Sequence, residues 1–402
     1  MSDAEALRLL SSATSAIVPE EGLREKLSRG RPLRVKLGLD PTAPAVTLGW
    51  AVVLRKLRQF QDLGHTAVLI VGDFTARVGD PSGTSDTRIR LSKEAVDGYA
   101  DNLLHQFWRI LDEDATELRR NSEWLEPMDM ESILRLTAAT TVARVLERDD
   151  FAKRFAAERP ISLMEFLYPL LQAYDSVAVE ADVELGGTDQ LFNLLMGREV
   201  QRANGQEPQV CLTVPLLEGT DGVQKMSQSL GNYVGIDEPS HEMFGKLMSI
   251  PDGLIARYVL LCTDGGSEEA ERVERGLADG TLHPNEAKRA MARAVVAQYH
   301  GANAAGEAEE RFNLVHREHE VPAEVEEAVI PEDALRDGRV WLPRLLVAVG
   351  MAASNAQARR DIEAGGVRLD GEPLTDPEAE LTPDEVRGHV LSVGRRRFVR
   401  LV

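Results

Sequence analysis

The chain has few cysteines, few aromatic residues and no excess of positive charge. Its 402 residues include only two cysteines, Cys211 and Cys262, which argues against a disulfide framework or a metal site and predicts a protein of the reducing cytoplasm. Aromatic residues make up 5%, but hydrophobic residues reach 43%, so a packed core is expected. The formal net charge of −20 excludes a protein that binds nucleic acid over its whole surface. We therefore expect no DNA partner, and any RNA contact has to be a local patch.

A long apolar run is also missing near the N-terminus. The segment MSDAEALRLLSSATSAIVPEEG carries acidic residues early, so it is expected to be neither a signal peptide nor a membrane span, and we expect no membrane partner. The length predicts two or three domains.

The spacing of apolar residues predicts an α/β fold. Residues 33–39 (LRVKLGL) indicate a strand, residues 50–64 (WAVVLRKLRQFQDLG) a helix that ends near Gly64, and residues 67–72 (AVLIVG) a buried strand. A strand, a helix and a strand in this order predict a parallel sheet covered by helices on both faces. Further strands are expected at 183–187 and 209–219, and mostly helical segments at 90–180 and 237–330.

The composition changes near residue 340. From Trp341 to Val402 the chain has nine arginines, no lysine and nine acidic residues, so this tail is neutral and the preceding body carries nearly all of the net charge. The acidic, turn-prone stretch at 329–338 (VIPEDALRDG) is the expected boundary.

The segment around Lys225, PLLEGTDGVQKMSQSLGNYVGI, carries a motif. A Lys-Met-Ser triplet alone is compatible with a solvated turn, but the whole segment is similar to the KMSKS loop of class I aminoacyl-tRNA synthetases. The resemblance implies that Lys225 and Ser227 are catalytic and that Lys225 and Gln228 face ATP, whose phosphates need cations as pyrophosphate departs. Gln228 stands where the family has a second lysine, and an amide cannot cancel charge.

The partner motif of that family, H-I-G-H, is altered. Here the matching segment runs from Asp40 to Trp50, DPTAPAVTLGW, in which the glycine is kept as Gly49 while Thr47 and Trp50 replace both histidines. The first 64 residues contain no histidine. The resemblance implies that Thr42 and Thr47 act in catalysis. It also implies an ATP site, for ATP with Mg²⁺ as substrate complex and no tightly bound cofactor, made of Gly38, Asp40, Gly49, Gly187, Asp189, Lys225 and Gln228.

A third set of residues resembles the amino-acid pocket of tyrosyl-tRNA synthetases. The segments are VGDFTARVGDPSG (71–83), EFLYPLLQAYDS (165–176) and ELGGTDQLFN (184–193). Tyr168, Gln172 and Asp175 share one helix face, which by itself is equally compatible with a polar surface stripe. By the resemblance, Asp175 would accept the phenol hydroxyl of tyrosine. The other tyrosine-binding residues would be Asp80, Tyr168 and Gln172 at the ammonium group and Gln190 near the carboxylate. Lys36 stands where many family members carry a second phenol-contacting tyrosine.

The tail resembles the S4 RNA-binding domain of bacterial tyrosyl-tRNA synthetases. The match covers LPRLLVAVGMAASNAQARRDIEAGGVRLDGEPL and the closing GRRRFVRLV. Arginine clusters bind phosphates with forked donors, although a charge run alone is usually a solvated surface. The resemblance implies RNA-binding roles for Arg359, Arg360, Arg395, Arg396 and Arg397.

The chain is thus identified as a member of the bacterial tyrosyl-tRNA synthetase family over about residues 15–402. This implies a Rossmann-like parallel-sheet catalytic domain with a helical insertion (1–236), a helical domain (237–335) and a small α+β S4-like domain (340–402). It also implies a cytoplasmic homodimer that binds tyrosine, ATP and tRNA(Tyr). The altered motifs predict a tyrosine–tRNA ligase-type protein that keeps tyrosine binding but has a weakened activation step. Three functions stay open: a compensated tyrosine–tRNA ligase, a catalytically impaired paralogue that binds tyrosine or tRNA as a regulator, and an enzyme that supplies activated tyrosine to another acceptor in specialised metabolism.

Overall fold

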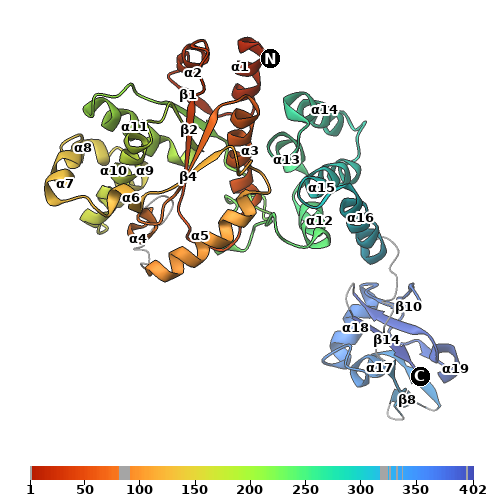
Figure 1. The fold of residues 1–402 in the computed structure, drawn as a ribbon. Coiled ribbons are helices and arrows are strands. Elements are labelled where there is room, and N and C mark those ends of the chain that lie inside the picture. Colours follow the sequence, from red (N-terminus) through yellow and green to blue (C-terminus); the bar gives the residue numbers. More distant parts are fainter. Residues whose placement is uncertain are drawn as a thin grey trace. The chain divides into compact units, whose positions relative to one another are not determined.

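The chain folds into two compact units, Met1–Glu309 and Glu310–Val402 (Figure 1). The computed structural model describes residues 2–80, 91–316, 325, 327–331, 334–336, 338–394 and 397–402.

The first unit is built on a twisted sheet of mostly parallel strands. Its strand order is β1-β6-β5-β2-β3-β4, and only β1 runs antiparallel to its neighbour, β6. The strands are β1 (Ala16–Val18), β2 (Arg34–Leu39), β3 (Thr66–Val71), β4 (Thr116–Arg120), β5 (Val183–Gly187) and β6 (Val210–Val214). Strands β3, β5 and β6 are almost wholly buried, which explains their continuous apolar runs.

The order of these strands reverses at β2. From β2 the chain passes through a helix to β3 on one side and continues outward to β4, whereas β5 pairs with the other side of β2. Open parallel sheets bind ligands at the carboxyl ends of the strands where the order reverses. The ends of β2 and β5 are therefore the expected place for a site.

Helix α3 (Leu48–Asp62) is the crossover between β2 and β3. Thr47 caps its N-terminus, since its hydroxyl accepts a hydrogen bond from the backbone N–H of Trp50 at 3.4 Å. Leu54, Leu57 and Phe60 are fully buried along its inner face. Gly64 follows the helix with φ of +83°, a conformation that suits glycine, so the expected helix and its end are confirmed.

The other helices of this unit lie around the sheet and in a group beside it. Those that precede β6 are α1 (Asp3–Ser11), α2 (Gly22–Leu27), α4 (Thr75–Val78), α5 (Lys93–Phe107), α6 (Ser122–Leu125), α7 (Met130–Thr137), α8 (Val142–Val145), α9 (Asp149–Ala156), α10 (Leu163–Ala178) and α11 (Leu191–Ala203), with the 3₁₀ turn η1 (Thr188–Gln190). Helices α10 and α11 pack closely against each other.

The helical group follows β6 in the chain. It consists of α12 (Ser240–Ser249), α13 (Ile255–Cys262), α14 (Gly266–Asp279) and α15 (Pro284–His300), with the 3₁₀ turns η2 (Gln228–Leu230) and η3 (Asp252–Leu254) before and within it. Figure 1 shows these helices together on one side of the sheet, where α13 also packs on α3. Helix α16 (Ala302–His316) comes next and crosses the boundary between the two units.

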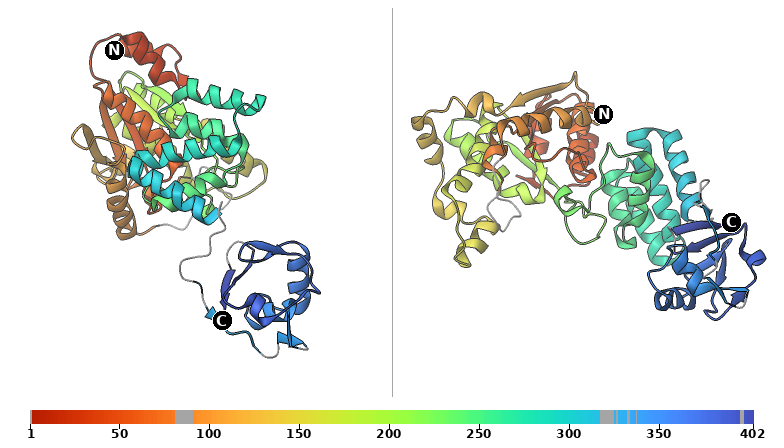
Figure 2. Two further views of the ribbon diagram at one scale, coloured as in Figure 1. Left: turned by 90° about the vertical axis from the view of Figure 1, so that its right-hand side faces the viewer. Right: turned by 90° about the horizontal axis from the view of Figure 1, so that it is seen from below.

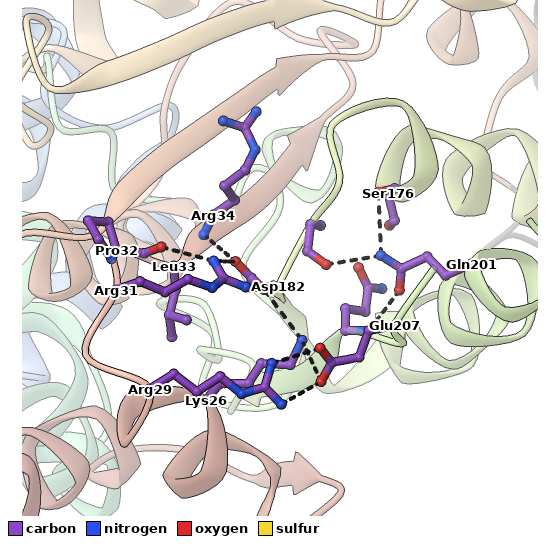
Figure 3. Close-up of polar contacts among 12 residues, drawn as sticks. Lys26, Arg29, Arg31, Pro32, Leu33, Arg34, Ser176, Asp182, Gln201 and Glu207 are labelled. Carbon is purple, nitrogen blue, oxygen red and sulfur yellow. Dashed lines mark hydrogen bonds and ion pairs between the residues drawn. The ribbon is translucent and has the colours of Figure 1, made fainter. Parts of the chain in front are cut away.

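A charged network fastens the beginnings of β2 and β5 to each other (Figure 3). Asp182 accepts hydrogen bonds from the guanidinium of Arg31 at 2.6 and 2.9 Å and from the backbone N–H of Arg34 at 3.0 Å. Lys26, only 3% exposed, lies 3.5 Å from Asp182 and 3.7 Å from Glu207, which also binds Arg29. This network lies at the amino ends of β2 and β5, opposite the carboxyl ends where a site is expected. We therefore assign it a role in the stability of the fold.

The second unit is a small α+β structure, drawn in blue in Figure 2. Among its described residues, five strands form a sheet in the order β11-β10-β13-β14-β7 and three more pair as β12-β9-β8. Its strands are β7 (Glu327–Ala328), β8 (Leu335–Arg336), β9 (Arg339–Trp341), β10 (Val367–Leu369), β11 (Glu372–Leu374), β12 (Glu380–Leu381), β13 (Val390–Val393) and β14 (Arg397–Leu401). Helices α17 (Leu342–Ala348), α18 (Asn355–Glu363) and α19 (Pro383–Val386) share one apolar core with the strands.

Among the described residues of the first unit, two strands lie outside the segments predicted as strands. Strand β1 follows the N-terminal helix, and β4 lies in the segment expected to be mostly helical. Strand β4 has no buried residue, and its sequence TELRR is polar, so it lacks the apolar run that marks a buried strand. It lies at one edge of the sheet, which explains that composition.

Candidate active site

A cavity of about 260 Å³ opens at the carboxyl ends of β2 and β5. It brings together most of the residues singled out from the sequence, although they come from six separate segments. The lining includes Gly38, Asp40, Thr42, Gly49, Asp80, Tyr168, Gln172, Asp175, Gly187, Asp189, Gln190 and Lys225. Thr47, Ser227 and Gln228 lie outside this lining.

Glycines keep part of the cavity open. A Cβ placed on Gly38 would meet no atom within 4 Å, so the space above this residue is unfilled. At Gly72 a Cβ would come within 2.0 Å of Asp40 Oδ1, so only glycine allows the Asp40 side chain its place. A Cβ on Gly187 would lie 2.7 Å from Asp189 Oδ1 and from Leu216. The first glycine leaves room for a ligand, and the other two let backbone and carboxylates approach closely.

Asp40 lies at the end of β2, held by two hydroxyl groups. Tyr168 donates a hydrogen bond to Asp40 Oδ2 at 2.9 Å, and Thr75 donates to Oδ1 at 2.7 Å. Burial raises the pKa of Asp40 to about 7 by disfavouring the charged form, and the two hydrogen bonds counteract that effect. Burial beside these carboxyl groups also raises the pKa of the Tyr168 phenol well above its usual value.

Asp175 lies on α10, deep in the cavity. Its Oδ1 accepts a hydrogen bond from the indole N–H of Trp124 at 2.8 Å, and Asn121 donates to Oδ2 at 3.4 Å. Burial raises the pKa of Asp175 to about 7, and the nearby Lys36 charge and these donors lower it. The side chain is only 3% exposed, so it is a buried acceptor that a ligand hydroxyl can reach from the cavity.

Amide side chains connect Asp80 to Gln172. Gln190 donates from Nε2 to Asp80 Oδ2 at 3.0 Å, and Asn193 donates from Nδ2 both to Gln190 Oε1 at 2.9 Å and to Gln172 Oε1 at 3.0 Å. Arg148, 6% exposed, lies 3.1 Å from Asp80. This chain of hydrogen bonds fixes three predicted tyrosine-binding side chains relative to one another.

Behind the cavity lies a fully buried ion pair between Lys36 and Glu184. The two side chains meet at 2.8 Å, and the Lys36 ammonium also donates to Ser176 Oγ at 2.8 Å and to the carbonyl of Gln172 at 3.0 Å. The ammonium thus ties β2 to α10 at Gln172. Sequence reasoning noted Lys36 but did not identify Glu184, Trp124 or Asn121.

The Lys225 loop lies at the mouth of the cavity. The Lys225 ammonium contacts Asp189 Oδ2 at 2.5 Å, and Ser227 Oγ lies 2.8 Å from Ser229 Oγ. Asn232 Oδ1 accepts from the backbone N–H of Ser227 at 2.8 Å, which closes the loop on itself. The Gln228 amide bonds to the backbone of Ala45 instead of pointing into the cavity.

Thr47 and Trp50, which replace the two histidines of the family motif, have different surroundings. Thr47 is 3% exposed, and its hydroxyl caps α3. Trp50 lines the cavity and lies beside Phe107, with 6.5 Å between the ring centroids. The N-cap role of Thr47 was available from the sequence, because a threonine immediately before an apolar-periodic segment is a helix-start signal.

The predicted RNA-binding arginines lie in the second unit. Arg359 on α18 forms an ion pair with Glu378 at 2.5 Å and lies over the ring of Trp341, while Arg360 is exposed on the same helix. Arg397 begins β14 and donates to the carbonyl of Met351 at 2.7 Å. Arg395 and Arg396 lie outside the described residues.

Comparisons with known proteins agree on one family. Residues 28–317 match the family described as tRNA synthetases class I (W and Y), and residues 340–386 match the S4 domain. The chain is 53% identical to the tyrosine–tRNA ligase of Moorella thermoacetica, covering 99% of this chain and 96% of that protein. It is 50% identical to the tyrosine–tRNA ligase of Geobacter sulfurreducens, covering 100% and 99%.

The chain belongs to the tyrosine–tRNA ligase family. A solved structure of the same kind is the tyrosyl-tRNA synthetase of Archaeoglobus fulgidus in complex with L-tyrosine. It is 25% identical, with a TM-score of 0.63, and the match covers 77% of this chain and 99% of that one. The expected family, the α/β fold with its parallel sheet and the C-terminal S4 domain are therefore confirmed.

Within the described ranges, no helix has both the length and the apolar character needed to cross a membrane. The same residues contain no group of three histidine, cysteine or acidic side chains arranged to hold a metal ion.

Proposed function

We propose that the chain activates tyrosine with ATP and transfers it to tRNA(Tyr), with an activation step slower than in relatives that keep the complete motifs. In activation a tyrosine carboxylate oxygen attacks the α-phosphorus of ATP, so that tyrosyl-adenylate forms and pyrophosphate leaves. A ribose hydroxyl of the tRNA then attacks the adenylate carbonyl, and AMP leaves. The observation that carries this proposal is the cavity that joins Asp175, Asp80 and Gln190 to Asp189 and Lys225.

The deep part of the cavity suits tyrosine. Asp175 offers a buried carboxylate to a phenol hydroxyl, and an amino acid without that hydroxyl would leave the carboxylate without this donor. Asp80, Tyr168 and Gln172 surround the place for an ammonium group, and Gln190 lies beside it. The pocket is held in place before any ligand binds, because Asn193 donates to the side chains of Gln172 and Gln190 and Lys36 donates to the backbone carbonyl of Gln172.

The outer part of the cavity suits ATP. Gly38 leaves an unfilled space at the end of β2, and Gly49 lines the wall at the start of α3. Asp189 provides a carboxylate for ribose hydroxyls, and Lys225 provides a cation for phosphates. Mg²⁺ would arrive with the phosphates, in line with the way this ion keeps several waters and binds through substrate oxygens.

The activation step lacks several groups that stabilise charge. No histidine stands at residue 47 or 50, the Thr47 hydroxyl caps α3, and the Gln228 amide is bound to Ala45. Losing one preorganised donor at a developing charge costs about 2.7–4 kcal/mol, or roughly 100–1000-fold in rate. Tyrosine contacts are untouched, so we expect near-normal tyrosine binding and slow chemistry.

Transfer of labelled tyrosine to tRNA tests the proposal. Purified protein incubated with ATP, Mg²⁺, tRNA and [¹⁴C]tyrosine should produce acid-precipitable tyrosyl-tRNA, and leaving out ATP should abolish the product. Replacement of Lys225 by alanine should reduce the rate further, since it removes the remaining cation of the loop. Labelling of tRNA with phenylalanine at the same rate would contradict the role of Asp175.

A second candidate is a tyrosine- or tRNA-binding regulator, or a supplier of activated tyrosine to another acceptor. Trp50 in the cavity wall favours it, because the indole stands where family members have a histidine. Calorimetric binding of tyrosine without any transfer to tRNA would support this candidate over the first.

We also propose three domains per chain at the boundaries expected from the sequence (1–236, 237–335 and 340–402).

We further propose a homodimer. Five large apolar side chains between residues 130 and 163 are more than 60% exposed, namely Met130, Leu134, Val142, Phe155 and Leu163. Four of them lie on α7, α8 and α9, and Leu163 begins α10. Figure 1 shows these four helices near one another. An apolar surface of this kind is typical of an interface, and a second copy of the chain is its proposed occupant.

A further inference from the structure

The segment Pro44–Val46 lies in the connection between β2 and α3 and forms hydrogen bonds along two edges. On one edge the Pro44 carbonyl accepts from Asn102 at 2.6 Å and from Gln106 at 3.0 Å, while the Val46 N–H donates to Gln106 Oε1 at 2.8 Å. The Gln106 side chain, 5% exposed on α5, thus bonds to both residues that flank Ala45.

The opposite edge belongs to Gln228. Its Nε2 donates to the Ala45 carbonyl at 2.7 Å, and its Oε1 accepts from the Ala45 N–H at 3.3 Å. We call this two-bond contact the Gln228–Ala45 pair. The Ala45 backbone offers one donor and one acceptor on the same side, and a primary amide matches both at once. The pair therefore joins two segments 183 residues apart in sequence in the way that a neighbouring strand would.

This contact belongs to a docked surface between the two motif loops. Beside it, the N–H of Leu48 donates to the Val234 carbonyl at 2.8 Å, and the N–H of Ile236 donates to the Val46 carbonyl at 2.9 Å. Those two bonds involve the residues that follow the Lys225 loop. Within the loop itself, the Gln228–Ala45 pair supplies two bonds to the first motif, three residues after Lys225.

We propose that Gln228 is a positioning residue, whose amide holds the Lys225 loop docked on Pro44–Val46 and so keeps the Lys225 ammonium at the mouth of the cavity. A lysine at this position has three donors and no acceptor, so it can satisfy the Ala45 carbonyl but not the Ala45 N–H. With glutamine at this position the loop is fixed by two hydrogen bonds, whereas a lysine would supply a second cation for the phosphates. This inference deepens the proposed function and rests on it only where ATP is concerned.

Hydrogen exchange and proteolysis test the docking without turnover. In Gln228→Ala, exchange of the Ala45 amide and trypsin cleavage after Lys225 should each accelerate by about ten-fold or more, since the variant removes two hydrogen bonds that close the loop. Gln228→Lys should lie between wild type and Gln228→Ala, because it keeps one of the two bonds. Two matched controls, Ser229→Ala in the same loop and Asn102→Ala on the opposite edge, should leave cleavage after Lys225 unchanged, as neither removes a bond between the loop and Ala45.

The kinetic split separates positioning from stability. Gln228→Ala should raise the KM for ATP several-fold, leave the KM for tyrosine unchanged and leave the melting temperature within about 2 °C of wild type, as expected for a partly exposed contact. Unchanged Ala45 exchange and unchanged cleavage in Gln228→Ala would overturn the proposal. Faster exchange throughout the first unit would also overturn it, because that result indicates a general structural role. If the protein proved inactive, the proposed function would fail, whereas the exchange and cleavage measurements would still decide the role of Gln228.

Discussion

The indole N–H of Trp124 donates a hydrogen bond to Asp175 Oδ1 across 2.8 Å at the deep end of the cavity. Asn121 donates to the other oxygen at 3.4 Å, so the orientation of this buried carboxylate is fixed before a ligand arrives. The geometry leaves Asp175 able to accept one further hydrogen bond from the cavity, and a phenol hydroxyl is a suitable donor.

At pH 8, above the Asp175 pKa of about 7, we expect Asp175→Asn to lower tyrosine affinity by roughly ten-fold or more, because a hydrogen bond to a charged group contributes about 1.5–3 kcal/mol. Phenylalanine has no hydroxyl group and forms no hydrogen bond with Asp175, so its weak affinity should change little. Titration calorimetry with both amino acids measures the difference. Asp73→Asn is a matched control, since Asp73 is also buried but hydrogen-bonds to Ser122 outside the cavity lining. Equal losses for the two amino acids would contradict the assignment of Asp175.

Asp40 predicts a pH dependence of stability. Its pKa rises from an ordinary 3.8 to about 7 on folding because it is buried. A carboxyl group with a raised pKa contributes stability that is fully present below its unfolded pKa and is lost as the pH rises through its folded pKa. Wild type should therefore lose stability relative to Asp40→Asn between about pH 4 and pH 8, by at most about 4 kcal/mol.

Asparagine suits this test because both partners of Asp40 are hydroxyl groups, Tyr168 and Thr75, which can rotate to donate or accept. Denaturant melts at pH 5 and pH 8 measure the effect. If the difference between variant and wild type were the same at both pH values, Asp40 would not carry the predicted pKa.

The proposed homodimer depends on the apolar side chains between Met130 and Leu163. Phe155→Glu combined with Leu163→Glu should convert the dimer to a monomer at micromolar concentration, because the interface would have to bury two carboxylates from each protomer. Light scattering gives the mass directly. Val329→Glu, at a valine that is 72% exposed in the second unit, is the control and should stay dimeric. A wild-type monomer would refute the prediction at once.

The arginines of α18 predict a salt-dependent interaction with tRNA. Arg360 is exposed, so Arg360→Ala should weaken tRNA binding and reduce the dependence of log K on log salt by about 0.7–0.9 for each phosphate that the protein no longer neutralises. Filter binding between 50 and 200 mM salt measures this slope, and Arg8→Ala, an exposed arginine on α1, serves as control. Identical slopes for Arg360→Ala and wild type would leave α18 a purely structural element.

Arg359→Ala should also lower the stability of the second unit, because it removes the Glu378 ion pair and the packing on Trp341.

Much of the cavity was predictable because its residues follow directly after buried strands. Asp40 comes after β2 and Asp189 after β5, and the carboxyl ends of parallel strands converge at one edge of a sheet. Gln172 and Asp175 were predictable for another reason, since helical spacing places them on one face of α10.

The rest depended on contacts that leave no local pattern. The sequence shows only that Gln228 replaces a lysine of the family motif. The fold shows that its amide is paired with Ala45, 183 residues away. Glu184 lies in a strand of otherwise apolar character, where its partner Lys36 comes from a different strand. Such pairings are fixed by tertiary packing, so neither propensity nor spacing along the chain reveals them.

Tyrosine-dependent exchange of pyrophosphate into ATP tests the central claim most directly. A tyrosine–tRNA ligase that keeps both histidines of the first motif and the second lysine of the loop is the comparison enzyme measured alongside. We predict exchange that requires tyrosine, a KM for tyrosine within a few-fold of that of the comparison enzyme, and a kcat lower by on the order of 100-fold or more because phosphate-facing donors are missing. A kcat equal to that of the comparison enzyme would contradict the claim of a slowed activation step, and no tyrosine-dependent exchange at all would contradict the proposed ligase activity.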